Sequence, residues 1–168
     1  MENIRSHKRN INQNDIEQRL RNVSIDKPVL IVEGSPVIAK ILLRLLENKG
    51  CCDIHLAENL ADTKQLLNQY WYDYHVAICD LTLPDTGNGE IVNLLTKAKV
   101  NMIIMSGSRP HDIVNLREEK YVIDFINKAE NNALEYASDL VVRLYKNNQV
   151  KALVVDDSRS AIELTSAM

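Results

Sequence analysis

Val29-Leu30-Ile31-Val32-Glu33-Gly34-Ser35-Pro36 carries the clearest indication of the fold in this chain. Its four consecutive apolar residues are typical of a strand buried on both faces, as in a parallel sheet. Ser35 and Pro36 suit the N-cap and the first position of a helix. The residues that follow are apolar at helical spacing up to Gly50, which suits a helix end. This stretch therefore predicts a strand, an acidic corner and a helix.

The same alternation of strand and helix continues along the chain. Further strands are predicted at 53–57, 75–79, 102–105 and 122–126. Further helices are predicted near 59–70, 91–95, 112–119 and 134–144. Alternating strands and helices form a parallel sheet with helices on both faces. The predicted fold class is α/β, a doubly wound five-stranded parallel sheet.

Composition narrows the function classes. The chain has 168 residues, of which 45% are hydrophobic and 26% are charged, as in soluble globular proteins. A net charge of −3 without a basic stripe argues against nucleic-acid binding. No apolar run reaches the length of a membrane span, and the N-terminus has no apolar signal core. An odd number of cysteines, with Cys79 inside an apolar run, favours free thiols and a cytoplasmic location.

The pattern divides the chain into three parts. Residues 1–27 are a polar N-terminal extension, for which a short helix and a partly ordered tail both stay open. Residues 28–149 hold the complete alternating unit. Leu153-Val154-Val155-Asp156-Asp157-Ser158 repeats the pattern of Leu30-Ile31-Val32-Glu33-Gly34-Ser35 at a constant offset. We therefore expect residues 150–168 to be the truncated start of a second copy.

Four polar residues follow predicted strands of this sheet: Glu33, Asp80, Ser106 and Lys128. The carboxyl ends of parallel strands meet at one edge, so we expect these side chains to lie together. They suit phosphoryl transfer to a carboxylate, which depends on positioning and charge stabilisation. Asp80 would accept the group, Lys128 would supply a charge and Ser106 a hydroxyl. Magnesium would be held by Glu33 and Asp80.

These motifs resemble the receiver domain of response regulators in two-component signalling, over about residues 28–147. The corner Val32–Pro36 resembles the family's acidic corner, and Cys79–Pro84 resembles its acceptor loop. Met105-Ser106-Gly107 and Phe125-Ile126-Asn127-Lys128 resemble the ends of its fourth and fifth strands. The resemblance implies a flavodoxin-like (βα)5 fold with Asp80 as phosphoacceptor. It also implies the Thr82 carbonyl as a metal ligand, and Ser106 with Phe125 as the switch pair.

The resemblance implies a signalling module rather than an enzyme. A histidine kinase or a phosphotransfer protein would phosphorylate Asp80. The signal would pass through the face formed by the fourth helix, fifth strand and fifth helix. The partial second copy resembles tandem-receiver regulators that end in a diguanylate cyclase domain. A second receiver and an output domain are therefore expected partners, and a homodimer stays open.

One departure from the family pattern leaves alternatives open. Gly34 stands where the family has a second acid, so we expect weak magnesium binding that Gly34→Asp would strengthen. A degenerate pseudo-receiver, acting as a dimerisation or docking adaptor without phosphorylation, is the main alternative. A haloacid dehalogenase-like phosphohydrolase is a remote one. That family needs a second Asp two residues after the nucleophile, and this chain has Thr82 there.

Overall fold

The computed structural model describes residues 24–70, 73–86, 89–107 and 120–147. The five strands are β1 (Val29–Val32), β2 (Ile54–Ala57), β3 (Val76–Asp80), β4 (Met102–Ser106) and β5 (Val122–Asn127). The helices of this described part are α2 (Pro36–Asn48), α3 (Leu60–Tyr70), α4 (Glu90–Lys97) and α5 (Ala133–Asn147). The helix predicted at 112–119 and the repeat after residue 150 lie outside the described residues, as does most of the N-terminal extension.

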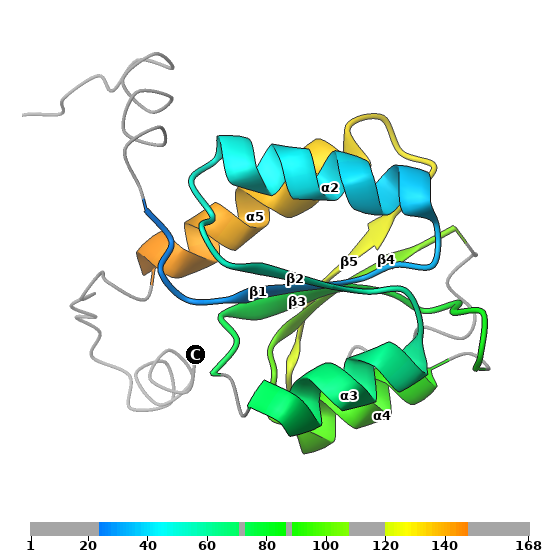
Figure 1. Ribbon diagram of the computed structural model, residues 1–168. Coiled ribbons are helices and arrows are strands. Elements are labelled where there is room, and N and C mark those ends of the chain that lie inside the picture. Colours follow the sequence, from blue (N-terminus) through cyan, green and yellow to red (C-terminus); the bar gives the residue numbers. More distant parts are fainter. Residues whose placement is uncertain (1–23, 71–72, 87–88, 108–119, 148–168) are drawn as a thin grey trace, which may run out of the picture.

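All five strands run parallel in the order β2-β1-β3-β4-β5. Figure 1 shows α2 and α5 over one face of the sheet and α3 and α4 over the other. The prediction of a doubly wound parallel sheet is confirmed. The chain steps from β1 outward to β2 and then crosses back to β3, so the strand order reverses between β1 and β3. Ligands of such folds bind at the carboxyl ends of the strands at this reversal.

Each face of the sheet buries its own apolar cluster, because successive strand residues point to opposite sides. In β1, Leu30 and Val32 face α3 and α4, whereas Val29 and Ile31 face α2 and α5. β3 and β4 alternate in the same way. The unbroken apolar runs of the sequence thus reflect strands that have helices packed on both faces.

The corner between β1 and α2 follows the sequence, with one difference. Ser35 has an extended backbone at the N-cap, and Pro36 opens the helix. Within the described residues, the Ser35 hydroxyl makes no capping hydrogen bond. Instead, the Ser35 amide donates to Glu33 Oε1 at 2.9 Å. Gly50, with φ of 92°, follows the end of this helix as expected.

The pairing of β5 with β4 contains an irregularity that sets the direction of its side chains. Met102 pairs with Val122, but Ile103 pairs with Asp124, so Ile123 is an extra residue. A bulge of this kind reverses the alternation beyond it. Val122 and Phe125 therefore both pack against the cluster under α3 and α4.

The first described residues belong to the packed fold. Ile25 is fully buried, and it forms an isolated parallel bridge with Cys51. Its amide donates to the Gly50 carbonyl at 2.9 Å. No helix in the described ranges is long and apolar enough to span a membrane.

Candidate functional site

Three of the predicted residues meet at the carboxyl edge of the sheet. Glu33 directly follows β1, Asp80 ends β3 and Lys128 directly follows β5. Val32 pairs with Cys79, so Glu33 and Asp80 lie at the same level of neighbouring strands. The Lys128 amide donates to the Ser106 carbonyl at 2.9 Å, which extends the ladder between β4 and β5 by one residue. The sheet register alone therefore brings these side chains together.

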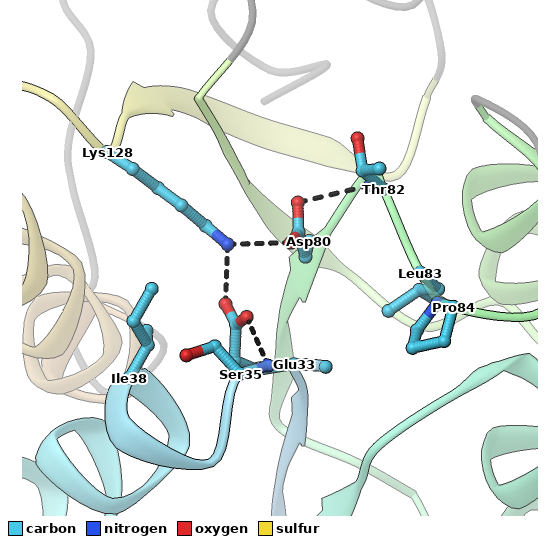
Figure 2. Close-up of a pocket in the computed structure, with 9 residues that line it drawn as sticks. Glu33, Ser35, Ile38, Asp80, Thr82, Leu83, Pro84 and Lys128 are labelled. Atoms are coloured by element: carbon cyan, nitrogen blue, oxygen red, sulfur yellow. Dashed lines mark hydrogen bonds and ion pairs between the residues drawn. The ribbon is translucent and has the colours of Figure 1, made fainter.

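Lys128 bridges the two carboxylates. Its Nζ lies 2.7 Å from Asp80 Oδ2 and 2.6 Å from Glu33 Oε2. Figure 2 marks both contacts with dashed lines. The side chains are only 14% (Lys128), 13% (Asp80) and 4% (Glu33) exposed. Such charges are screened less by solvent than surface pairs are. One cation thus holds two buried carboxylates against each other's repulsion.

Backbone amides fix the remaining oxygens of these carboxylates. The Ser35 amide donates to Glu33 Oε1, and the Thr82 amide donates to Asp80 Oδ1 at 3.1 Å. Each of the four oxygens therefore has a donor within hydrogen-bond distance. Charge-assisted bonds of this kind orient a carboxylate strongly.

A pocket of about 440 Å³ opens above this ion-pair group. It is lined by Glu33, Gly34, Ser35, Ile38, Asp80, Thr82, Leu83, Pro84 and Lys128. Polar groups converge on its floor, and apolar side chains from α2 and from the loop after β3 form its walls. The pocket thus brings one ammonium and two carboxylates to a single concave surface.

Cys79 precedes Asp80 and is fully buried in the sheet. Burial raises the pKa of its thiol to about 12, with a smaller contribution from the neighbouring Asp80 charge. The thiol therefore stays protonated near neutral pH and is a poor nucleophile. Of these two neighbouring side chains, Asp80 lines the pocket and Cys79 does not.

Gly34 is packed under the loop that follows β3. A Cβ added at Gly34 would lie 2.9 Å from Pro84 Cδ and 3.2 Å from Pro84 Cγ. The carbonyl of Glu58 would be 3.4 Å away. A side chain here would push against a proline ring. The glycine is therefore part of the packing, and replacing it with an acid alone strains the loop.

The two expected switch residues lie at the edge of this arrangement. Ser106 ends β4 and is 3% exposed, but it is not among the residues that line the pocket. Phe125 is partly buried and packs against the cluster under α3 and α4. It pairs with Ile104, two residues before Ser106 on β4. The ring and the hydroxyl thus lie on neighbouring strands.

The donor set fits a magnesium ion, with fewer protein ligands than the family pattern supplies. Glu33 and Asp80 place two carboxylates in one pocket, and magnesium typically uses one or two carboxylates with water and phosphate oxygens. Thr82, the third expected ligand, lines the same pocket. The described residues contain no cluster of three His, Cys, Asp or Glu side chains that could hold a metal.

Sequence reasoning missed two features of the site. Asp85 lies in the loop after Asp80, and its carboxylate accepts hydrogen bonds from the amides of Leu60 and Ala61 at 2.8 and 3.0 Å. The bond between Lys128 and Glu33 was also not expected. Both contacts join residues far apart in the chain. Such contacts depend on how the strands are ordered in the sheet. One sequence does not reveal that order directly.

Comparison with known proteins points to one family. Residues 29–137 match the response regulator receiver domain. A solved structure described as a "probable two-component system response regulator/GGDEF domain protein" is 32% identical, with a TM-score of 0.73. The match covers 84% of this chain and 57% of that one. A response regulator receiver domain protein from Clostridium thermocellum shares the fold, with 16% identity and a TM-score of 0.59 over 73% of this chain and 97% of that one.

One curated relative has a different description. The DNA repair and recombination protein RadB of Methanococcus maripaludis is 26% identical over 149 residues, which is 89% of this chain and 61% of that protein. The chain thus spans less than two thirds of both this relative and the response regulator/GGDEF structure. At that identity, the RadB likeness does not show a family for this chain.

Proposed function

Because the chain belongs to the response regulator receiver domain family, we propose that it is a phosphoacceptor module that is phosphorylated on Asp80. The donor would be a histidine kinase or a phosphotransfer protein. The observation that carries this proposal is the contact of Asp80 with Lys128 at 2.7 Å, in a pocket that Glu33 also lines. A carboxylate at a strand end, beside a partly buried lysine and a second acid, is suited to accept a phosphoryl group.

The chemistry requires one carboxylate oxygen to attack phosphorus. An Asp80 oxygen forms the new O–P bond while the bond from phosphorus to the donor histidine nitrogen breaks. The leaving nitrogen keeps that electron pair. The Lys128 ammonium lies beside the attacking carboxylate and can follow the charge onto the phosphoryl oxygens. The amide of Thr82 holds Asp80 in place. The protein thus contributes mainly position and charge.

Magnesium would be held by Glu33, Asp80 and the Thr82 carbonyl. When bound, it would neutralise negative charge shared between the carboxylates and the phosphoryl oxygens. Lys128 already pairs with both carboxylates, and Gly34 adds no third one. The net negative charge that attracts a cation is therefore smaller than in a three-carboxylate corner. Weak magnesium binding follows from this difference.

The proposal extends to the rest of the molecule. Ser106 and Phe125 act as the switch pair, and the signal leaves through β5, α5 and the predicted helix at 112–119. Residues 153–158 repeat the sequence pattern of residues 30–35, so residues 150–168 would begin a second receiver. A second receiver and an output domain such as a GGDEF domain would be partners of this chain. The protein works in the cytoplasm, in keeping with three cysteines that are all free.

A degenerate receiver that serves as a docking or dimerisation adaptor is the second candidate. The observation that favours it is the close packing of Pro84 over Gly34, which leaves no room for the acid of the family pattern. In this reading, Lys128 makes the site stable without any phosphoryl group. The two candidates differ in whether Asp80 responds to a phosphoryl mimic.

Titration with beryllofluoride and magnesium, followed by amide NMR, tests the proposal. The phosphoacceptor reading predicts saturable shifts at Asp80, Thr82 and Ser106 that disappear in Asp80→Asn. Asp73→Asn, an exposed carboxylate whose ion pair with Lys27 lies in another part of the fold, is the matched control and should respond like the wild type. Equal spectra with and without the mimic at saturating magnesium would favour the adaptor reading.

A further inference from the structure

We infer that Asp85 is a positioning residue for phosphoryl transfer, because it holds the loop after Asp80 against the N-terminus of α3. This inference rests on the proposed function and deepens it. Asp85 is not among the residues that line the pocket around Asp80. Its effect would reach Asp80 through the intervening residues of the loop.

The Asp85 carboxylate accepts two hydrogen bonds from the N-terminus of α3, one on each oxygen. Asp85 Oδ1 accepts from the Leu60 amide at 2.8 Å, and Oδ2 accepts from the Ala61 amide at 3.0 Å. These are the first two residues of α3, whose amides have no partner within the helix. The bond from Leu60 is the main reason that the pKa of Asp85 is lowered, so the carboxylate is ionised at neutral pH.

The start of α3 is capped in part from within its own sequence. Asn59 Oδ1 accepts from the Asp62 amide at 2.8 Å, and Asp62 Oδ2 accepts from Asn59 Nδ2 at 2.8 Å. This reciprocal pair closes the start of α3 from within its own sequence. Asp85 comes from a loop 25 residues away and takes the two amides that remain. Its main consequence is therefore to tether the loop.

The tethered loop carries the groups that complete the site. Thr82, whose amide binds Asp80, lies three residues before Asp85, and its carbonyl is the proposed third magnesium ligand. Pro84, directly before Asp85, packs over Gly34. Leu83 is buried at 4% exposure. With Thr82 held at one end and Asp85 at the other, the loop has a fixed path across the corner.

Removal of the tether should weaken magnesium binding without abolishing phosphorylation. Loss of a residue that orients a metal ligand typically costs ten- to a hundredfold in affinity. We expect Asp85→Ala to raise the magnesium concentration for half-maximal phosphorylation by acetyl phosphate about tenfold. The maximal rate should stay close to that of the wild type. Asp85→Asn keeps one acceptor oxygen and should give an intermediate value.

Asp62→Ala is the matched control, because it weakens the start of α3 but leaves the loop attached. The full 168-residue chain is used for each variant. Calorimetry with magnesium alone gives a second readout that does not depend on phosphorylation. A tenfold weaker magnesium affinity in Asp85→Ala, with Asp62→Ala unchanged, supports the inference.

The inference is wrong if the magnesium affinity falls equally in Asp85→Ala and Asp62→Ala, or if it changes in neither variant. It is also wrong if the wild type binds no magnesium. The proposed function fails in a distinct way. If the wild type is never phosphorylated, Asp80 is not the acceptor. Calorimetry still measures the magnesium affinity of each variant in that case, so the inference about Asp85 is tested separately. If phosphorylation occurs with the same magnesium dependence in Asp85→Ala, only the inference about Asp85 is wrong.

Discussion

Glu33 and Lys128 are 95 residues apart in the sequence, yet Glu33 Oε2 and Lys128 Nζ form an ion pair of 2.6 Å. The same ammonium reaches Asp80 at 2.7 Å. This geometry makes Lys128 both the neighbour of the proposed acceptor and a link between the first and last strands in the sequence. A residue that is expected to act in chemistry also stabilises the resting fold.

Lys128→Met should destabilise the protein by about 3 kcal/mol, because it leaves the buried Glu33 and the partly buried Asp80 carboxylates without their cation. Adding Glu33→Gln should restore part of that loss. The effects of the two substitutions on the free energy of unfolding should therefore not be additive. Urea unfolding of the wild type, both single variants and the double variant measures the coupling energy, expected at about 1–3 kcal/mol.

Lys27→Met is the control for this cycle. Lys27 pairs with Asp73 at 2.6 Å, but their side chains are 51% and 85% exposed. Exposed pairs typically contribute less than about 1 kcal/mol, so this variant should unfold nearly like the wild type. Additive effects of Lys128→Met and Glu33→Gln would show that the buried bridge does not stabilise the fold.

Gly34→Asp should destabilise the protein by about 1–3 kcal/mol and improve magnesium binding only slightly, because its Cβ meets Pro84 at 2.9 Å. Gly34→Asp combined with Pro84→Ala should bind magnesium more tightly than either single variant. Calorimetry measures both affinities, and Gly34→Ala separates the steric effect from the added carboxylate. If Gly34→Asp alone binds as tightly as the double variant, the proline does not restrict this corner.

Phe125→Ala should uncouple the phosphoryl site from any change in association. The ring packs against the cluster under α3 and α4, and Ser106 ends the neighbouring strand. Sedimentation with and without beryllofluoride compares the association of wild type and variant. Ile123→Ala, which removes a 40% exposed side chain from the same strand, is the control. An equal response to beryllofluoride in Phe125→Ala and wild type would rule out this switch.

Stability should fall as the pH drops below about 6.5, partly because of His75. The ring is 7% exposed and its Nε2 lies 3.0 Å from the Val141 carbonyl. Burial lowers the pKa of His75 from its ordinary 6.5, so the unfolded chain takes up a proton first. The free energy of unfolding therefore falls by at most about 1.4 kcal/mol for each pH unit below 6.5. This dependence ends below the pKa of His75 in the folded protein. His75→Gln should remove it in denaturant unfolding followed against pH. An unchanged slope would assign it to other groups.

The sequence was sufficient to predict the sheet and the residues at its carboxyl edge. Unbroken apolar runs such as Val29–Val32 and Val76–Cys79 are typical of strands that are covered on both faces, and both runs form such strands. The carboxyl ends of parallel strands share one edge of the sheet, so Glu33, Asp80 and Lys128 could be placed together in advance. Their roles in phosphoryl transfer stay predictions.

The finer contacts depend on distances between strands and loops, which periodicity does not encode. The clash that a side chain at Gly34 would have with Pro84 needs the path of the loop after β3. The bond from Asp85 to α3 crosses from one loop to another helix. The extra residue Ile123 in β5 is not visible in a hydrophobic pattern, yet it sets the side on which Phe125 packs.

Covalent labelling shows whether Asp80 accepts a phosphoryl group. The chain is incubated with acetyl phosphate at saturating magnesium, and intact-protein mass spectrometry counts phosphoryl groups while borohydride trapping locates them. We predict one hydroxylamine-sensitive phosphoryl group on Asp80 in the wild type and in Asp73→Asn, and none in Asp80→Asn. A label that persists in Asp80→Asn, or a wild type that takes up none, would contradict the assignment of Asp80 as the phosphoacceptor.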